Sequence, residues 1–142
     1  LRLEKKFLHW GHDITSENNP FEAGLSFAVS LNKKNEFIGR EAIEQILKKP
    51  SEKKLQLFSL KNHFIPGKPL LLHDEPIYYK EKIIGSTTSS NYSFYYKKNI
   101  FLAYIVNGFE KQDLYLEVEG KRYPISLEKD PLHDPKSLKI RN

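Results

Sequence analysis

The sequence contains no cysteine. This absence excludes disulfide bonds, thiolate metal sites and cysteine nucleophiles together. It fits a reducing compartment, and we expect the cytoplasm. The chain also lacks an apolar run near the roughly 18 residues that span a membrane, and no stretch has the pattern of a signal peptide. The sequence therefore predicts no membrane partner.

The chain also has too few residues for two full domains. Its 142 residues suffice for one domain, or for a small domain with part of another attached. The first residue is Leu1 where a Met would be expected, and the opening run is already dense in apolar and charged residues. We therefore expect that the chain begins in mid-protein. The 39% hydrophobic and 29% charged residues are typical of a soluble, packed protein.

The net charge of +5 could attract a polyanion such as nucleic acid. The lysines, however, come as scattered pairs, such as Lys33-Lys34 and Lys97-Lys98, and form no basic stripe. Eight tyrosines occur, all from residue 78 onward, and in a β domain such residues usually cover a sheet face. We therefore expect a lysine-rich solvated surface and no nucleic-acid partner.

The chain divides near residue 50. Residues 1–7 alternate apolar and charged side chains, which predicts a half-buried strand, and residues 25–31 predict a buried strand. Between them, Asn19 and Pro20 predict the start of one helical turn that Gly24 closes. Residues 39–49 place apolar side chains at helical spacing, which predicts a helix.

The second unit, residues 51–142, has the pattern of successive strands. Residues 53–60 predict a strand, 76–86 a hairpin turning at Lys80 to Lys82, and 114–127 a hairpin turning at Gly120-Lys121. The apolar run at 99–106 predicts a central strand buried on both faces. Strands at this spacing without helices predict a small barrel or sandwich.

Candidate chemistry is sparse. His9, His12 and Asp13 could donate ligands to a metal. Their side chains need not converge, however, and the sequence suggests no further partner, so we predict no metal site. Trp10-Gly11 predicts a tight turn that presents an aromatic ring. The hydroxyl-rich stretch 85–90 lacks the spacing of a phosphate loop and predicts a β-turn. Glu22 and Asp13 have no perturbing partner in view, so we predict no catalytic residue.

A family resemblance rests on several anchors in order. They are LRLE at 1–4, HWGHD at 9–13, PFEAGL at 20–25 and FIGREAI at 37–43, followed by IGSTTSSNYS, NIFLAYI, LEVEGKRYPISL and PLHDP. Together they resemble the carboxy-terminal portion of the glycine-cleavage T-protein (aminomethyltransferase) family. The HWGHD variant is more similar to the folate-binding region of dimethylglycine and sarcosine dehydrogenases. Lys6 stands where that family usually has glycine.

The resemblance implies an α+β, mainly β fold. Residues 1–50 would be the carboxy-terminal part of an α/β folate-binding middle domain, and residues 51–142 a small antiparallel β-barrel of Greek-key or jelly-roll type. It also implies tetrahydrofolate bound in a cleft shared with upstream domains. Candidate folate-binding residues are Phe7, Trp10, Phe27 and His133.

The implied function is that of a carboxy-terminal fragment of a folate-dependent one-carbon transfer enzyme similar to dimethylglycine or sarcosine dehydrogenase, inactive by itself. FAD would belong to the parent chain and not to this fragment. A glycine-cleavage aminomethyltransferase or a folate-dependent demethylase is the first alternative. A non-catalytic β interaction module is the second, and it belongs to a different functional class.

Overall fold

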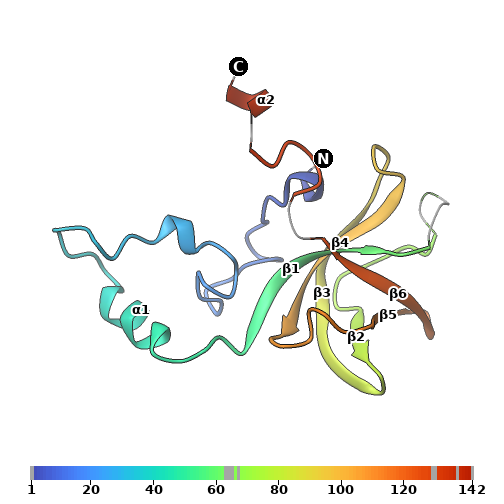
Figure 1. Ribbon diagram of the computed structural model, residues 1–142, viewed down its shortest axis with the longest axis horizontal. Coiled ribbons are helices and arrows are strands. Elements are labelled where there is room, and N and C mark those ends of the chain that lie inside the picture. Colours follow the sequence, from blue (N-terminus) through green and yellow to red (C-terminus); the bar gives the residue numbers. More distant parts are fainter. Residues whose placement is uncertain (1, 63–65, 67, 129–130, 137, 142) are drawn as a thin grey trace.

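The fold is dominated by a closed antiparallel barrel of six strands (Figure 1). The computed structural model describes residues 2–62, 66, 68–128, 131–136 and 138–141. The strands run in the spatial order β1-β4-β3-β2-β5-β6. They comprise β1 (Lys53–Leu60), β2 (Pro76–Tyr79), β3 (Lys82–Ser93), β4 (Lys98–Val106), β5 (Leu114–Val118) and β6 (Lys121–Glu128). The order β1-β4-β3-β2 is a Greek-key arrangement, so the predicted mainly β fold with a small barrel is confirmed.

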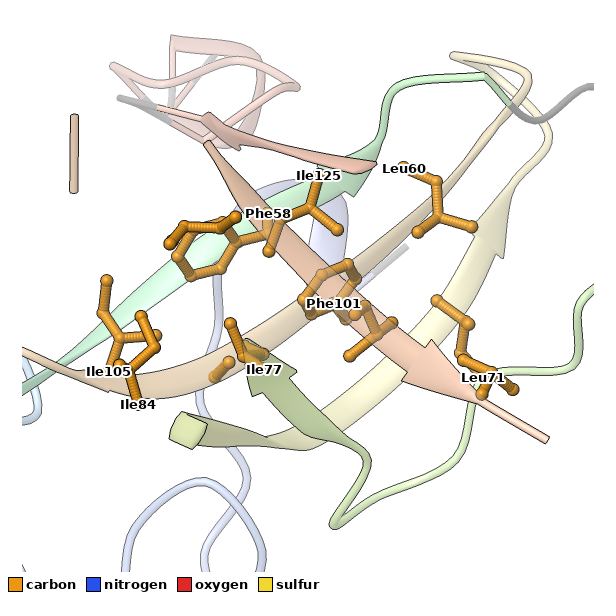
Figure 2. Close-up of a cluster of buried hydrophobic side chains, with 12 residues drawn as sticks. Phe58, Leu60, Leu71, Ile77, Ile84, Phe101, Ile105 and Ile125 are labelled. Atoms are coloured by element: carbon orange, nitrogen blue, oxygen red, sulfur yellow. The ribbon is translucent and has the colours of Figure 1, made fainter. Parts of the chain in front are cut away.

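The barrel closes around an apolar interior. Phe58 on β1 and Phe101 on β4 stack there, with ring centroids 5.6 Å apart, and aliphatic side chains from the other strands surround them (Figure 2). Alternate residues point inward because the side chains of a strand have a period of two. This periodicity is why the strand at 53–60 and both hairpins were predictable, and all three are confirmed.

Strand β4 is buried on both faces, as its continuous apolar run predicted. Phe101, Ala103 and Ile105 belong to the barrel interior. Ile100 and Leu102 point outward and pack with Leu3, Leu55 and Leu57 in a second apolar cluster. The first segment of the chain thus covers the outside of the barrel at β1 and β4.

The hydroxyl-rich stretch 85–90 forms no turn, so that prediction was wrong. It continues β3, which pairs with β2 on one side and with β4 on the other. Gly85 is required in this strand because a Cβ atom built on it would lie 2.0 Å from the Tyr104 carbonyl oxygen. The glycine permits close approach of two backbones beside the β2–β3 register shift, a common use of glycine within strands.

The strand predicted at residues 1–7 is absent. Leu3–Lys5 form the 3₁₀ helix η1, which ends at Lys6 in the left-handed conformation with φ 56°. Seven residues are too few to separate strand from helical periodicity, and Leu3 reaches the second apolar cluster from a helical turn. Lys6 holds the backbone conformation that glycine adopts most easily, at the position where the family usually has glycine.

The strand predicted at 25–31 is also wrong. Ser26–Ala28 form the 3₁₀ helix η2, none of whose residues is buried. An apolar run becomes a strand only beside a partner, and every pairing edge of the described barrel is already occupied. The turn at 20–24 is confirmed, because the Asn19 side chain accepts hydrogen bonds from the backbone N–H groups of Phe21 and Glu22.

Two helices complete the described chain. Helix α1 (Arg40–Leu47) confirms the predicted helix and lies apart from the barrel (Figure 1). Its apolar face has no buried residue. Helix α2 (Leu138–Arg141) follows the barrel near the amino-terminal segment. Among the described residues, no helix is both long and apolar enough to cross a membrane.

Candidate functional site

Asp13 is the carboxylate that fixes the first segment to the barrel. It is fully buried. Its Oδ2 accepts hydrogen bonds from Arg2 Nη1 at 2.6 Å and from the His9 backbone N–H at 2.8 Å. Its Oδ1 accepts one from the Thr88 hydroxyl of β3 at 2.6 Å. Asp13 therefore anchors the amino-terminal segment to β3.

The pKa of Asp13 reflects two opposed effects. Burial acts to raise the pKa, but hydrogen bonds from Thr88, Ser89, the His9 backbone and Arg2 outweigh burial and hold the pKa below its usual range. A carboxyl group whose pKa is lower in the folded state contributes stability above its unfolded pKa, near 3.9. That contribution is lost as the pH falls through the folded pKa.

We expect Asp13→Asn to lower the free energy of unfolding by about 1.5–3 kcal/mol at pH 7, because charge-assisted hydrogen bonds are replaced by neutral ones. Urea unfolding at pH 7 and at pH 3 measures this, and the difference between wild type and variant should shrink at pH 3. Asp113→Asn is the matched control, since the Asp113 side chain is 89% exposed and lies 3.7 Å from Lys61. Equal losses in both variants would contradict the anchoring role.

The carboxy-terminal segment meets the amino-terminal one beside the barrel (Figure 1). The backbone N–H of His133 donates to the Glu4 carbonyl at 2.9 Å, and Lys5 Nζ lies 2.8 Å from Asp134 Oδ2. The hydrogen bond from Lys5 lowers the pKa of Asp134. The Tyr96 hydroxyl donates to the Leu132 carbonyl. Segments from both ends of the chain therefore form one wall.

Two cavities open along this wall, and together we call them the Phe7 cleft. The larger, of about 780 Å³, is lined by Arg2, Glu4, Lys5, Phe7, Asn91, Tyr92, Phe94, Tyr95, His133 and Lys139. The smaller, of about 500 Å³, is lined by Lys5, Lys6, Phe7, Leu8, Ile14, Ala23, Gly24, Leu25, Phe27, Pro131, Asp134 and Pro135. Because Lys5 and Phe7 line both, the two cavities are adjacent.

The structure brings three of the four candidate folate-binding residues to this cleft. Phe7 is 52% exposed and lines both cavities. His133 lines the larger cavity, with its ring 5.5 Å from that of Tyr95, and Phe27 lines the smaller one. Trp10 lines neither of them: it sits on the predicted tight turn, where Gly11 has a φ of 91°. Their roles in binding stay predictions.

The aromatic residues between β3 and β4 were not identified as site residues from the sequence. Tyr92 and Phe94 are in edge-to-face contact, and Phe94 and Tyr95 are largely exposed at the larger cavity. Their only sequence signal was the density of aromatic residues in NYSFYY, which we attributed to sheet faces. Exposed aromatic faces beside Arg2 and Lys5 suit a planar, anionic ligand.

Glu4 adds a buried carboxylate to the larger cavity. It is 7% exposed and accepts a hydrogen bond from the Ser93 hydroxyl, which in turn accepts one from the Tyr96 backbone N–H. Within the described residues, no group of three or more His, Asp or Glu side chains is placed to hold a metal ion.

Comparison with known proteins gives two family matches. Residues 53–134 match the glycine cleavage T-protein C-terminal barrel domain, and residues 1–33 match the GCVT N-terminal domain. Human dimethylglycine dehydrogenase is 37% identical over 93% of this chain and 15% of its own length. An aminomethyltransferase of Prochlorococcus marinus is 35% identical over 94% of this chain and 35% of its own length. The chain thus spans about a third or less of these relatives.

A solved structure shares the fold. The aminomethyltransferase T of the glycine cleavage system from Bartonella henselae superposes with a TM-score of 0.81 at 23% identity. The match covers 95% of this chain and 37% of that one.

Proposed function

The chain belongs to the glycine cleavage T-protein family, and from this premise we propose that it is the carboxy-terminal part of a tetrahydrofolate-dependent one-carbon transfer enzyme. We further propose that the enzyme is similar to dimethylglycine or sarcosine dehydrogenase. The identity to dimethylglycine dehydrogenases of rat and human, 36% and 37%, supports this choice. We also propose that the protein is located in the cytoplasm, because the absence of cysteine fits a reducing compartment.

The observation that carries the proposal is the Phe7 cleft. Tetrahydrofolate has a planar ring system and an anionic tail, and the larger cavity offers exposed aromatic rings beside Arg2, Lys5 and Lys139. Phe7 and Tyr95 would provide apolar contact surface to the ring, and His133 a hydrogen-bonding edge. The chemistry of the residues present therefore fits the cofactor.

When bound, tetrahydrofolate supplies an amine that accepts a one-carbon unit. The described residues would orient it and exclude water from one side, and orientation and water exclusion both assist transfer. We assign no catalytic residue to this chain. The parts of the cleft that face the reacting carbon would come from upstream domains, and the unburied apolar face of α1 and the exposed Phe27 supply surface for them to cover.

A glycine-cleavage aminomethyltransferase or a folate-dependent demethylase is the alternative of the same class. Aminomethyltransferases are also among the relatives, at 35% and 31% identity. The upstream sequence decides between the two: a G-x-G-x-x-G segment after a strand indicates the FAD domain of a dehydrogenase, and its absence favours the alternative. A non-catalytic β module, the third candidate, predicts no effect of folate.

Calorimetric titration of tetrahydrofolate into the full-length protein tests the proposal. We expect binding, and we expect Phe7→Ala to weaken it roughly tenfold or more through lost aromatic contact. His133→Gln changes the larger cavity alone, and Phe27→Ala changes the smaller one alone. Whichever of these two variants binds tetrahydrofolate more weakly therefore identifies the cavity that holds it. Ile83→Ala, an exposed position on β3 that lines neither cavity, is the control and should bind like wild type.

Three results would count against the proposal. Absence of binding by the full-length protein excludes the folate function. Micromolar binding by the 142-residue chain alone contradicts a cleft shared with upstream domains. Unchanged affinity in all three cleft variants places the folate elsewhere.

A further inference from the structure

A separate groove shares only Arg2 with the lining of the Phe7 cleft. It has a volume of about 370 Å³, and we call it the histidine groove. Its walls include His9 and His12 from the Trp10 turn, His73 from the segment before β2, and the hydroxyl-bearing residues 88–90 of β3. The ring centroids of His9 and His12 are 4.8 Å apart, and those of His12 and His73 are 6.3 Å apart. The fold thus gathers three imidazoles from two distant segments.

The acidic groups at this groove are already engaged. Asp13 lies fully buried beneath it and receives hydrogen bonds from Arg2, Thr88 and the His9 backbone. Asp74 lies 2.7 Å from His73 Nδ1. No set of side chains among the described residues is placed to hold a metal ion, so a cation has no ready ligands here.

What the groove offers a ligand is hydrogen-bond donors. The Arg2 side chain is 38% exposed, and within the described part of the chain its Nη1 donates to Asp13 and to the Phe7 carbonyl. His9 and His12 are exposed, and each imidazole presents a ring N–H. The hydroxyls of Thr88 and Ser90 donate inward, to Asp13 and to the Leu71 carbonyl. The donors that remain for a ligand are therefore the nitrogen atoms of Arg2 and the histidines.

We propose that the histidine groove binds a tetrahedral oxyanion of the phosphate or sulfate type. Arg2 would contribute a permanent positive charge, and His12, between the other two imidazoles, would contribute the central contact. A guanidinium paired with imidazole donors matches the several oxygens of such an anion. The groove shares Arg2 with the Phe7 cleft but none of its three histidines, so histidine variants test this proposal separately from the folate function.

Binding should be coupled to proton uptake. Imidazole gains its charge between pH 8 and pH 5. Imidazolium rings at these separations repel each other, and a dianion among them removes that penalty. Arg2 lines the groove, the Asp74 carboxylate lies beside His73, and Glu75 and Glu119 lie close enough to interact with each other, so protonation of the histidines offsets nearby negative charge and favours an anion.

Sulfate is the suitable probe, because it stays a dianion across the whole range. We expect calorimetric titration of sulfate into the 142-residue chain to saturate, with affinity at pH 6 at least about tenfold higher than at pH 8. Proton uptake should appear as a dependence of the heat on the buffer. Trp10, the only tryptophan, lies between His9 and His12, and its fluorescence should follow the same isotherm.

Two variants and a control decide the outcome. His12→Gln and His73→Gln should each weaken sulfate binding about tenfold at pH 6, since each removes a charged donor. Both side chains are exposed, so the fold should persist, and circular dichroism checks this. Lys121→Gln removes a positive charge from the β5–β6 turn, away from the groove, and should bind like wild type.

The proposal is overturned if sulfate produces no saturable signal, if chloride at equal ionic strength gives the same change, or if the histidine variants bind like Lys121→Gln. At pH 6, comparison of inorganic phosphate with phenyl phosphate, with affinities expressed per dianion because the two acids ionise differently, identifies the source of the anion. Tighter binding of the ester indicates a phosphorylated ligand that also contacts Leu72 beside the groove, and equal affinity indicates a free ion.

Discussion

Alanine at position 85 is expected to disrupt the barrel. The added Cβ atom would lie 2.0 Å from the Tyr104 carbonyl oxygen and 3.0 Å from the Ile105 Cα. Both neighbours are backbone atoms of β4, so no side-chain rotation relieves the overlap. Gly85 pairs with Ile77 on β2 and with Ile105 on β4, and moving it disturbs both pairings. We expect Gly85→Ala to lower the free energy of unfolding by at least about 3 kcal/mol.

Urea unfolding followed by circular dichroism measures this loss. Ser86→Ala is the matched control, because it changes the next residue of the same strand without adding an atom near β4. We expect it to stay within about 0.5 kcal/mol of wild type. Indistinguishable midpoints for the two variants would show that β3 and β4 do not approach closely at Gly85.

Phe101→Ala should lower the free energy of unfolding by a similar amount. Gly85→Ala adds an atom where there is no room, whereas Phe101→Ala leaves a void. Phe101 is fully buried and stacks on Phe58 with an interplanar angle of 17° (Figure 2). Truncation of a buried phenylalanine typically costs about 3–5 kcal/mol. Since small domains are stable by about 5–15 kcal/mol, much of the total stability would be lost.

Thermal or urea unfolding tests this expectation, with Phe94→Ala as the control. Phe94 is 75% exposed, so its truncation should change stability by less than about 0.5 kcal/mol. The double variant with Phe58→Ala should lose less than the sum of the two single losses, because the stacked pair is removed only once. Additive losses would contradict a direct contact between the rings.

The sequence predicted strands well where burial alternates over many residues. Strand β5 carries that pattern, and β4 was predictable for another reason, because its unbroken apolar run showed that both of its faces are buried. Two of the three failed predictions share one cause. The run at 25–31 became η2, and the hydroxyl-rich stretch at 85–90 became strand, because pairing partners decide such segments and local composition does not report them.

The candidate site was harder to predict from the sequence than the strands were. Phe7, Phe27 and His133 came from the family resemblance, and the fold brings them to the same wall. The contact between Asp13 and Thr88 joins residues 75 positions apart, which no local pattern encodes. The 70% exposure of Tyr95 depends on how the β3–β4 connection projects from the barrel, which the aromatic composition of the segment does not encode.

The order of the strands around the barrel also sets a sequence of events during synthesis. Leu57 on β1 pairs with Leu102 on one side and with Glu128 on the other. Among the six barrel strands β6 comes after the others along the chain, so β1 keeps one unpaired edge until β6 has emerged from the ribosome. Unpaired edges invite association with other chains. Pairing of β6 with β1 therefore removes the last open edge of the described barrel.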